Sequence, residues 1–196
     1  MRHHRRAAAT AVAAALSSVS LLAAGPAWAA ADPSGGTIRP GGDIADENCE
    51  EFSSLGPLDI ELTGIPDPVV AGEWAEFTYR ITNTYDYPVD HLYTFVALGA
   101  YDTIDGADIA TRGQWFVRGA WRDLDRADDT DEYFGRTGAL APGESAEARM
   151  RVTVDASAPE RALGTAGMMG TFADDATGVC ESTVTDMEFD VAAELS

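Results

Sequence analysis

The sequence predicts an all-β protein, a sandwich or a barrel of about seven strands. Several short segments alternate apolar and polar residues with the two-residue period of a half-buried strand. Gly, Pro, Asn and Asp separate these segments, as is typical of turns. No segment keeps a helical period along its length. Short strands with this spacing pack as two layers or close into a barrel.

Three strands are predicted in the first half of the chain. Residues 58–62 and 75–82 alternate apolar and polar side chains, as in strands with one face in a core. Residues 91–100 form a largely apolar run, which is expected of a strand covered on both faces. Turns follow the first two strands, because residues 65–72 contain two prolines and a glycine and residues 83–88 contain Asn and Pro.

Residues 114–122 predict a β-hairpin. Gly119 supplies the positive φ that a tight turn requires. A two-residue loop would set Phe116 opposite Trp121 on one face of the hairpin and leave Trp115 on the other face.

Three further strands complete the prediction. Residues 146–154 alternate more regularly than any other segment, and residues 161–172 are apolar and rich in glycine. Residues 179–191 predict the last strand, with a bulge where the alternation slips between Val184 and Met187. These strand phases place eight side chains in the core: Phe77, Tyr79, Ile81, Phe95, Met150, Val152, Val154 and Phe189.

The first 29 residues have the three parts of a secretory signal peptide. A basic start precedes the apolar stretch 7–24, and Ala27-Trp28-Ala29 supplies small residues at both positions that signal peptidase recognises. We expect removal of residues 1–29, a flexible Gly-, Pro- and Asp-rich lead-in over 30–48, and one folded domain over 49–194.

This leader predicts a secreted, extracellular protein, with or without attachment to the cell wall. An uncleaved transmembrane helix is the alternative, but three serines and Pro26 interrupt the apolar stretch. Arg5-Arg6 leaves a twin-arginine export route open beside general secretion.

The chain is strongly acidic and contains no lysine. Its 13 arginines and 33 Asp and Glu residues give a formal charge of −20. The leader contains three of these arginines and no acid, so its removal would change the charge to −23. Such a surface repels nucleic acid and anionic lipid, and it attracts cations or a basic partner. We expect no nucleic-acid partner and no membrane anchor.

Two cysteines follow the leader, Cys49 and Cys180. An even number of cysteines in an exported chain usually forms disulfides, and here a single pairing exists. A metal site is the alternative, but His91 is the one histidine beyond the leader and no paired-cysteine spacing occurs. The sequence therefore predicts a Cys49–Cys180 disulfide.

Two motifs together point to a family. Residues 74–84 (WAEFTYRITNT) run as a strand into a turn that contains Pro88-Val89. Residues 140–159 join a Leu-x-Pro-Gly turn, a strand and an Ala-x-Ala-Pro segment. Over roughly residues 56–192 the chain resembles the Ig-like modules of secreted and cell-wall-associated actinobacterial proteins, and it is similar to CARDB-type adhesion modules. The resemblance implies an Ig-like antiparallel β-sandwich of about seven to nine strands.

No catalytic constellation is evident in the sequence. A nucleophile triad needs a histidine beside a serine or cysteine, with a carboxylate to orient it. His91 is the one candidate histidine, and the chain has no glycine-flanked serine elbow. We therefore predict that the protein is not an enzyme and has no catalytic residues.

Residues 123–132 are the densest acidic segment and a candidate Ca²⁺ site. Oxygen-rich loops suit Ca²⁺, which takes six to eight oxygen ligands. The spacing does not fit an EF-hand, because Asp128 stands where that loop requires glycine. The sequence favours a solvated loop without a cofactor, and a Ca²⁺ site is the alternative. The candidate ligands are Asp123, Asp125, Asp128, Asp129 and Asp131.

Burial in the core is the favoured interpretation of most aromatic side chains in a sandwich of this size, and a sugar-stacking platform is the alternative. The candidates for that platform are Trp115 and Trp121, together with Tyr85, Tyr87, Tyr93 and Tyr101. The strand pattern, the leader and the missing catalytic constellation favour a non-enzymatic extracellular module with an interaction or structural role. Its partner would be an extracellular protein or a cell-wall glycan. The alternatives are a carbohydrate-binding module and a hydrolase inhibitor that presents a loop.

Overall fold

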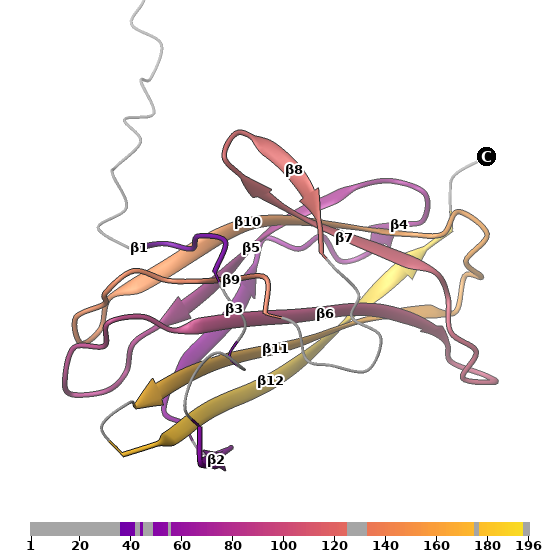
Figure 1. Ribbon diagram of the computed structural model, residues 1–196. Helices are drawn as coiled ribbons and strands as arrows, with labels where there is room; N and C mark the ends of the chain where they lie inside the picture. The colour runs from indigo at the N-terminus through magenta and orange to yellow at the C-terminus, as the bar shows by residue number, and fades with distance from the viewer. Residues whose placement is uncertain are drawn as a thin grey trace, which may run out of the picture. The chain divides into compact units, whose positions relative to one another are not determined.

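The computed structural model describes residues 36–41, 44, 49–54, 56–124, 133–174 and 177–193. The predicted signal peptide lies outside these residues. The described chain forms two β-sheets that enclose one apolar core, so the predicted all-β sandwich is confirmed (Figure 1). In none of the described ranges is there a helix long and apolar enough to cross a membrane.

The first sheet has six strands. Its order is β3 (Asp59–Thr63), β5 (Ala75–Thr82), β10 (Ser145–Val154), β7 (Thr111–Val117) and β8 (Ala120–Asp123). The short strand β1 (Gly36–Thr37) pairs in parallel with β10, and all other pairs are antiparallel. The predicted hairpin is confirmed as β7–β8, with Phe116 opposite Trp121.

The second sheet also has six strands. Its order is β2 (Glu51–Ser53), β12 (Val179–Ala192), β11 (Ala162–Asp174), β6 (Tyr93–Asp102) and β9 (Gly135–Arg136), and β4 (Val69–Val70) pairs with the end of β12. The twelve strands of the described chain exceed the predicted seven to nine. The surplus consists of β1, β2, β4 and β9, whose two or three residues are too short to show an alternation.

The core contains seven of the eight side chains that the alternation predicts. Those from β5, β10 and β12 are at most 3% exposed. Phe95 is the exception: it lies half-buried on the outer face of the second sheet, and Val96 takes the core position. The prediction failed here because β6 is apolar on both faces, so its composition does not reveal which face turns inward.

The bulge predicted in the last strand is also wrong. β12 pairs with β11 residue by residue from Val179 to Asp190. The face that is buried changes along a regular strand: Cys180 and Ser182 are covered on the outer face, whereas Phe189 and Val191 enter the core. This change of covered face produces the slip in the apolar pattern without any backbone irregularity.

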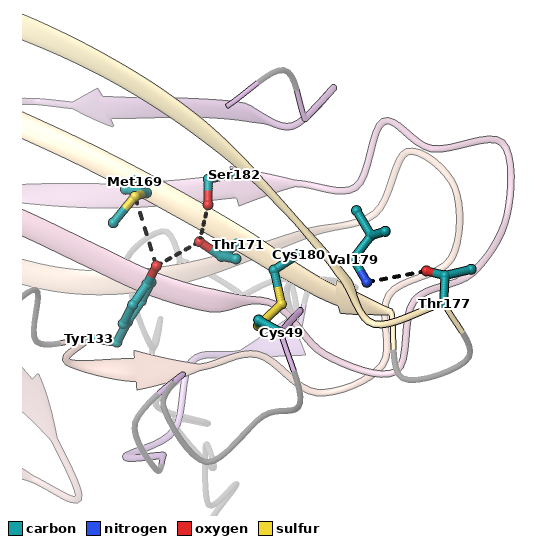
Figure 2. Close-up of a disulfide and its surroundings, with 8 residues drawn as sticks. All are labelled: Cys49, Tyr133, Met169, Thr171, Thr177, Val179, Cys180 and Ser182. Carbon is teal, nitrogen blue, oxygen red and sulfur yellow. Dashed lines mark hydrogen bonds between the residues drawn. A yellow bond between two sulfur atoms is a disulfide. The ribbon is translucent and has the colours of Figure 1, made fainter. Parts of the chain in front are cut away.

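The predicted disulfide joins Cys49 to Cys180, with a Cα–Cα distance of 5.5 Å (Figure 2). It attaches the segment leading into β2 to the start of β12, where the Glu50 amide also donates to the Gly178 carbonyl. Figure 2 shows a polar cluster beside it on the same face, in which Thr171 contacts both the Tyr133 hydroxyl and the Ser182 hydroxyl. A disulfide fits an oxidising, extracellular environment.

Part of the predicted flexible lead-in, residues 30–48, belongs to the fold. Gly36 pairs with Ala146 of β10, and Ile38 is a core residue that is 4% exposed. Arg39 exchanges two backbone hydrogen bonds of 2.8 Å with Arg136. One apolar side chain among glycines and prolines is too weak a pattern to predict a strand, which explains why the sequence did not show this pairing.

Two glycines of β11 provide a first prediction about packing. A Cβ on Gly164 would lie 2.0 Å from the Phe189 ring, whereas a Cβ on Gly167 has no atom within 4 Å. We expect Gly164→Ala to lower the free energy of unfolding by about 1–3 kcal/mol, because the buried ring must shift. Gly167→Ala should leave stability equal or slightly higher. Urea denaturation of both variants checks this, and equal stabilities would contradict the packing.

Candidate functional site

An interleaved row of arginine and aromatic side chains covers part of the outer face of the first sheet. The strict alternation of β10 sends Arg149 and Arg151 outward while its apolar residues enter the core. The neighbouring segments supply the remaining side chains. We call the set the arginine–aromatic ladder, and its members are Trp74, Arg112, Phe116, Trp121, Arg149 and Arg151.

Arg151 occupies the centre of this ladder. Its guanidinium carbon lies 4.3 Å from the ring centroid of Trp74 and 4.3 Å from that of Trp121. Arg149 lies 5.2 Å from Trp121 and 5.3 Å from Phe116. Arg112 ends the row at 5.8 Å from Trp74. Each such contact contributes about 0.5–1 kcal/mol at an exposed site.

The β7–β8 hairpin positions two of the aromatic rings. Phe116 and Trp121 are directly opposite each other, with ring centroids 5.3 Å apart in an edge-to-face arrangement. The turn places Arg118 and Gly119 at φ values of 53° and 80°. Two residues with positive φ are the geometry that follows the right-handed twist of the flanking strands. The short turn therefore fixes this cross-strand aromatic pair.

Hydrogen bonds hold the guanidinium groups in place. Arg151 donates from Nε and Nη2 to the Gln114 Oε1, at 2.9 and 2.5 Å. Gln114 in turn donates to Asp123 at 2.7 Å, and Arg112 pairs with the same carboxylate. These donors hold the pKa of Asp123 below its usual value, with the Gln114 hydrogen bond as the largest cause.

The ladder is unusual in so acidic a chain. Arg151 donates to the neutral amide of Gln114, whereas Arg149 forms an ion pair with Glu76 at 2.5 Å. Trp74 and Phe116 remain 37% exposed, so the ladder presents aromatic surface to solvent. The face therefore combines fixed cations, exposed rings and a few carboxylates.

The structure separates the two tryptophans that the sequence suggested as a platform. Trp121 belongs to the ladder. Trp115 lies on the core side, is 6% exposed and packs edge-on against Phe134 at 5.0 Å. Sequence reasoning missed the other members of the ladder. The available indication was the outward phase of β10, which carries Arg149 and Arg151 in a chain with few cations.

One of the five candidate Ca²⁺ ligands lies within the described residues. Asp123 is on β8 and is engaged with Gln114 and Arg112, as described above. Four candidates lie outside the described residues: Asp125, Asp128, Asp129 and Asp131. Within the described ranges, no group of three or more His, Cys, Asp or Glu side chains could hold a metal ion.

Two further polar side chains, His91 and Asp102, make contacts within the sandwich. His91 packs edge-on against Tyr93, with ring centroids 5.1 Å apart. Asp102 accepts two hydrogen bonds from Arg161, at 2.7 and 2.5 Å, and these donors lower the pKa of its carboxyl group. Both contacts hold side chains of the sandwich in place.

No protein-family model and no curated protein matches this sequence. Among solved structures, AvmM, which catalyses macrocyclisation in alchivemycin A biosynthesis, is 13% identical with a TM-score of 0.48, covering 74% of this chain and 93% of that one. An α-2-macroglobulin fragment from Escherichia coli is 18% identical with a TM-score of 0.45, covering 71% and 17%. A cohesin module of a Clostridium perfringens family 33 glycoside hydrolase is 13% identical with a TM-score of 0.34, covering 72% and 100%. We draw no functional conclusion from these distant similarities.

Proposed function

We propose that this chain is a secreted, non-enzymatic Ig-like β-sandwich module that binds another extracellular protein through its arginine–aromatic ladder. The ladder is the observation that carries the proposal. Trp, Tyr, Phe and Arg are enriched in protein–protein interfaces, and Trp and Arg are frequent among the residues that dominate binding energy. The hydrogen bonds and cation–π contacts fix these side chains before binding, which reduces the conformational entropy lost on association.

The geometry favours a protein partner over a glycan. A sugar ring stacks on the free face of an aromatic side chain. In the ladder, Arg151 stands over both Trp74 and Trp121 at 4.3 Å, and Arg149 also approaches Trp121. A sugar would have to displace a guanidinium that Gln114 holds with two hydrogen bonds. A protein surface can contact the exposed parts of these side chains without displacing any of them.

The test compares ladder variants with a control on the other sheet. The purified mature chain, immobilised, is exposed to extracellular proteins of the source organism, and captured proteins are quantified by mass spectrometry. Trp74→Ala and Trp121→Ala should lose the proteins that the unaltered chain retains. Val184→Ala should retain them, because Val184 is 57% exposed on the second sheet. An identical set of proteins on all variants would refute the proposed surface.

The carbohydrate-binding alternative is tested with the same variants on cell-wall polysaccharide, chitin and cellulose. We expect none of these polymers to retain the chain. Retention that disappears in Trp121→Ala but persists in Val184→Ala would establish a glycan-binding module and overturn the protein-binding proposal.

A further inference from the structure

A small pocket lies at one end of the second sheet, on strands that do not contribute to the ladder. The β11–β12 register sets Phe172 opposite Glu181 and Asp174 opposite Val179. These side chains share the inward face of the sheet, at the end where the turn after β5 approaches it. The pocket has a volume of about 260 Å³ and is lined by Tyr87, Phe172, Asp174, Thr177, Val179 and Glu181.

Hydrogen bonds of the Asn83 side chain hold the turn that contains Tyr87. Asn83 is fully buried and donates to the carbonyl oxygens of Tyr87 and Leu140, at 3.0 and 2.9 Å. Its side-chain oxygen accepts from the Tyr85 amide at 3.0 Å. All these partners lie within hydrogen-bond distance, so the turn holds its tyrosines in place without a ligand.

Aromatic rings form one wall of the pocket. Tyr85 packs against Tyr87 at 4.9 Å and against Phe172 at 5.4 Å, and the centroids of Tyr87 and Phe172 are 6.2 Å apart. Tyr85 is 8% exposed and contacts both of the other rings. Tyr87 is 43% exposed, so its ring remains accessible to a ligand.

Two carboxylates, Asp174 and Glu181, also line the pocket. The Tyr85 hydroxyl donates to the Glu181 Oε2 at 2.5 Å, and burial, followed by this hydrogen bond, raises the pKa of Tyr85. The phenol therefore keeps its proton and orients the carboxylate. Burial and the charges of Glu181, Asp174 and Asp86 raise the pKa of Tyr87 as well. The exposed Tyr87 ring thus lies close to carboxylates.

We propose that this pocket binds a guanidinium group, supplied by an arginine side chain of a basic partner segment. A guanidinium stacks on aromatic faces and donates in a planar fork that matches carboxylates. The pocket is smaller than the roughly 300–1,000 Å³ of sites for drug-sized ligands, which suits a single side chain. The formal charge of −20 attracts a basic segment at long range.

The experiment is a titration followed by NMR, with the mature protein and a capped Gly-Arg-Gly peptide. A salt concentration of about 0.15 M limits long-range attraction. The arginine peptide should produce saturable shifts at the backbone amides of Tyr87 and Glu181. The same peptide with citrulline, which has nearly the same shape and no charge, should produce none. A lysine peptide should bind more weakly, because its ammonium lacks the planar fork.

Four variants separate the pocket from general electrostatic attraction. Tyr87→Ala and Glu181→Gln should each weaken binding about fivefold or more. In Glu181→Gln the amide oxygen still accepts from Tyr85, so the fold is retained. Tyr87→Phe keeps the ring and should bind normally. Asp186→Asn removes one charge from the exposed side of β12 and should change binding less than about twofold.

Three results would overturn the assignment. The first is equal binding of the arginine and citrulline peptides, and the second is equal binding of the lysine peptide. The third is an equal loss of affinity in Tyr87→Ala and Asp186→Asn, which would mean that charge alone attracts the peptide. Because the pocket and the ladder use different strands, failure of the ladder experiments leaves this result unaffected.

Discussion

Replacing both cysteines, Cys49→Ser with Cys180→Ser, should lower the free energy of unfolding by about 2–5 kcal/mol. The disulfide spans 131 residues, and constraining a loop of that length in the unfolded chain is worth about 5 kcal/mol in the chain-entropy model. In the described part of the attached segment, β2 pairs three residues with β12, and Phe52 remains 63% exposed. Urea denaturation of the variant and the oxidised chain measures the loss.

The reducing agent provides the internal control. Reductant should move the denaturation midpoint of the unaltered chain toward that of the double variant and leave the variant unchanged. The dependence of the unfolding free energy on urea should be steeper for the reduced chain and for the double variant than for the oxidised chain. The reason is that an unfolded chain without the cross-link exposes more surface. A midpoint that does not respond to reductant in the unaltered chain would contradict a stabilising disulfide.

The long strands were predictable because each keeps one face in the core. Along β5 and β10, apolar and polar residues alternate without a break. The alternation alone therefore shows which side chains of these strands point into the core. The outer faces of β6 and β12 are partly covered as well. Tyr133 packs near Phe95 of β6 and forms a hydrogen bond with Thr171 of β11, which in turn forms one with Ser182 of β12. When both faces of a strand are covered, apolar residues occur on both faces and the alternation no longer shows which face points into the core. For that reason Phe95 was wrongly predicted to be a core residue.

The two candidate sites were not predictable from local patterns. The ladder joins Trp74, Trp121 and Arg151 from three separate segments, and the pairing of β10 with β7 and of β7 with β8 brings two of these segments together. The pocket joins a turn after β5 to strands about a hundred residues later, through Tyr85 and Glu181. Sequence indicated the residue types but not these long-range pairings, which depend on sheet order.

The proposed binding role of the ladder is compatible with a strongly acidic chain. Like charges across most of the surface oppose association with other acidic proteins. Arg149 and Arg151 are two residues apart in β10. Both side chains therefore lie on the same face of the sheet, among aromatic rings. This face therefore carries a higher density of arginine side chains than the acidic net charge of the whole chain suggests.

Val152→Asp should unfold the domain. Val152 is fully buried at the centre of the first sheet, where β10 pairs with both β5 and β7. Substitution by aspartate removes the buried apolar surface of the valine. It also places in the core either a charge or a protonated acid that has no hydrogen-bond partner. We expect a loss of roughly 4 kcal/mol or more, comparable to the whole stability of many domains. Far-UV and near-UV circular dichroism with thermal melting measures it.

Thr153→Asp is the matched control, because it introduces the same acid one residue later on the same strand. Thr153 faces the outer side of the sheet, and its cross-strand partner is Arg112, an opposite charge that can pair with the new carboxylate. The Thr153→Asp domain should therefore remain folded, with stability within about 1 kcal/mol of the unaltered chain. The difference between the two variants arises only from the two-residue period, which points one side chain into the core and the next into solvent. Unfolding of both variants, or of neither, would show that the strand phase on which the sandwich and the ladder both depend is wrong.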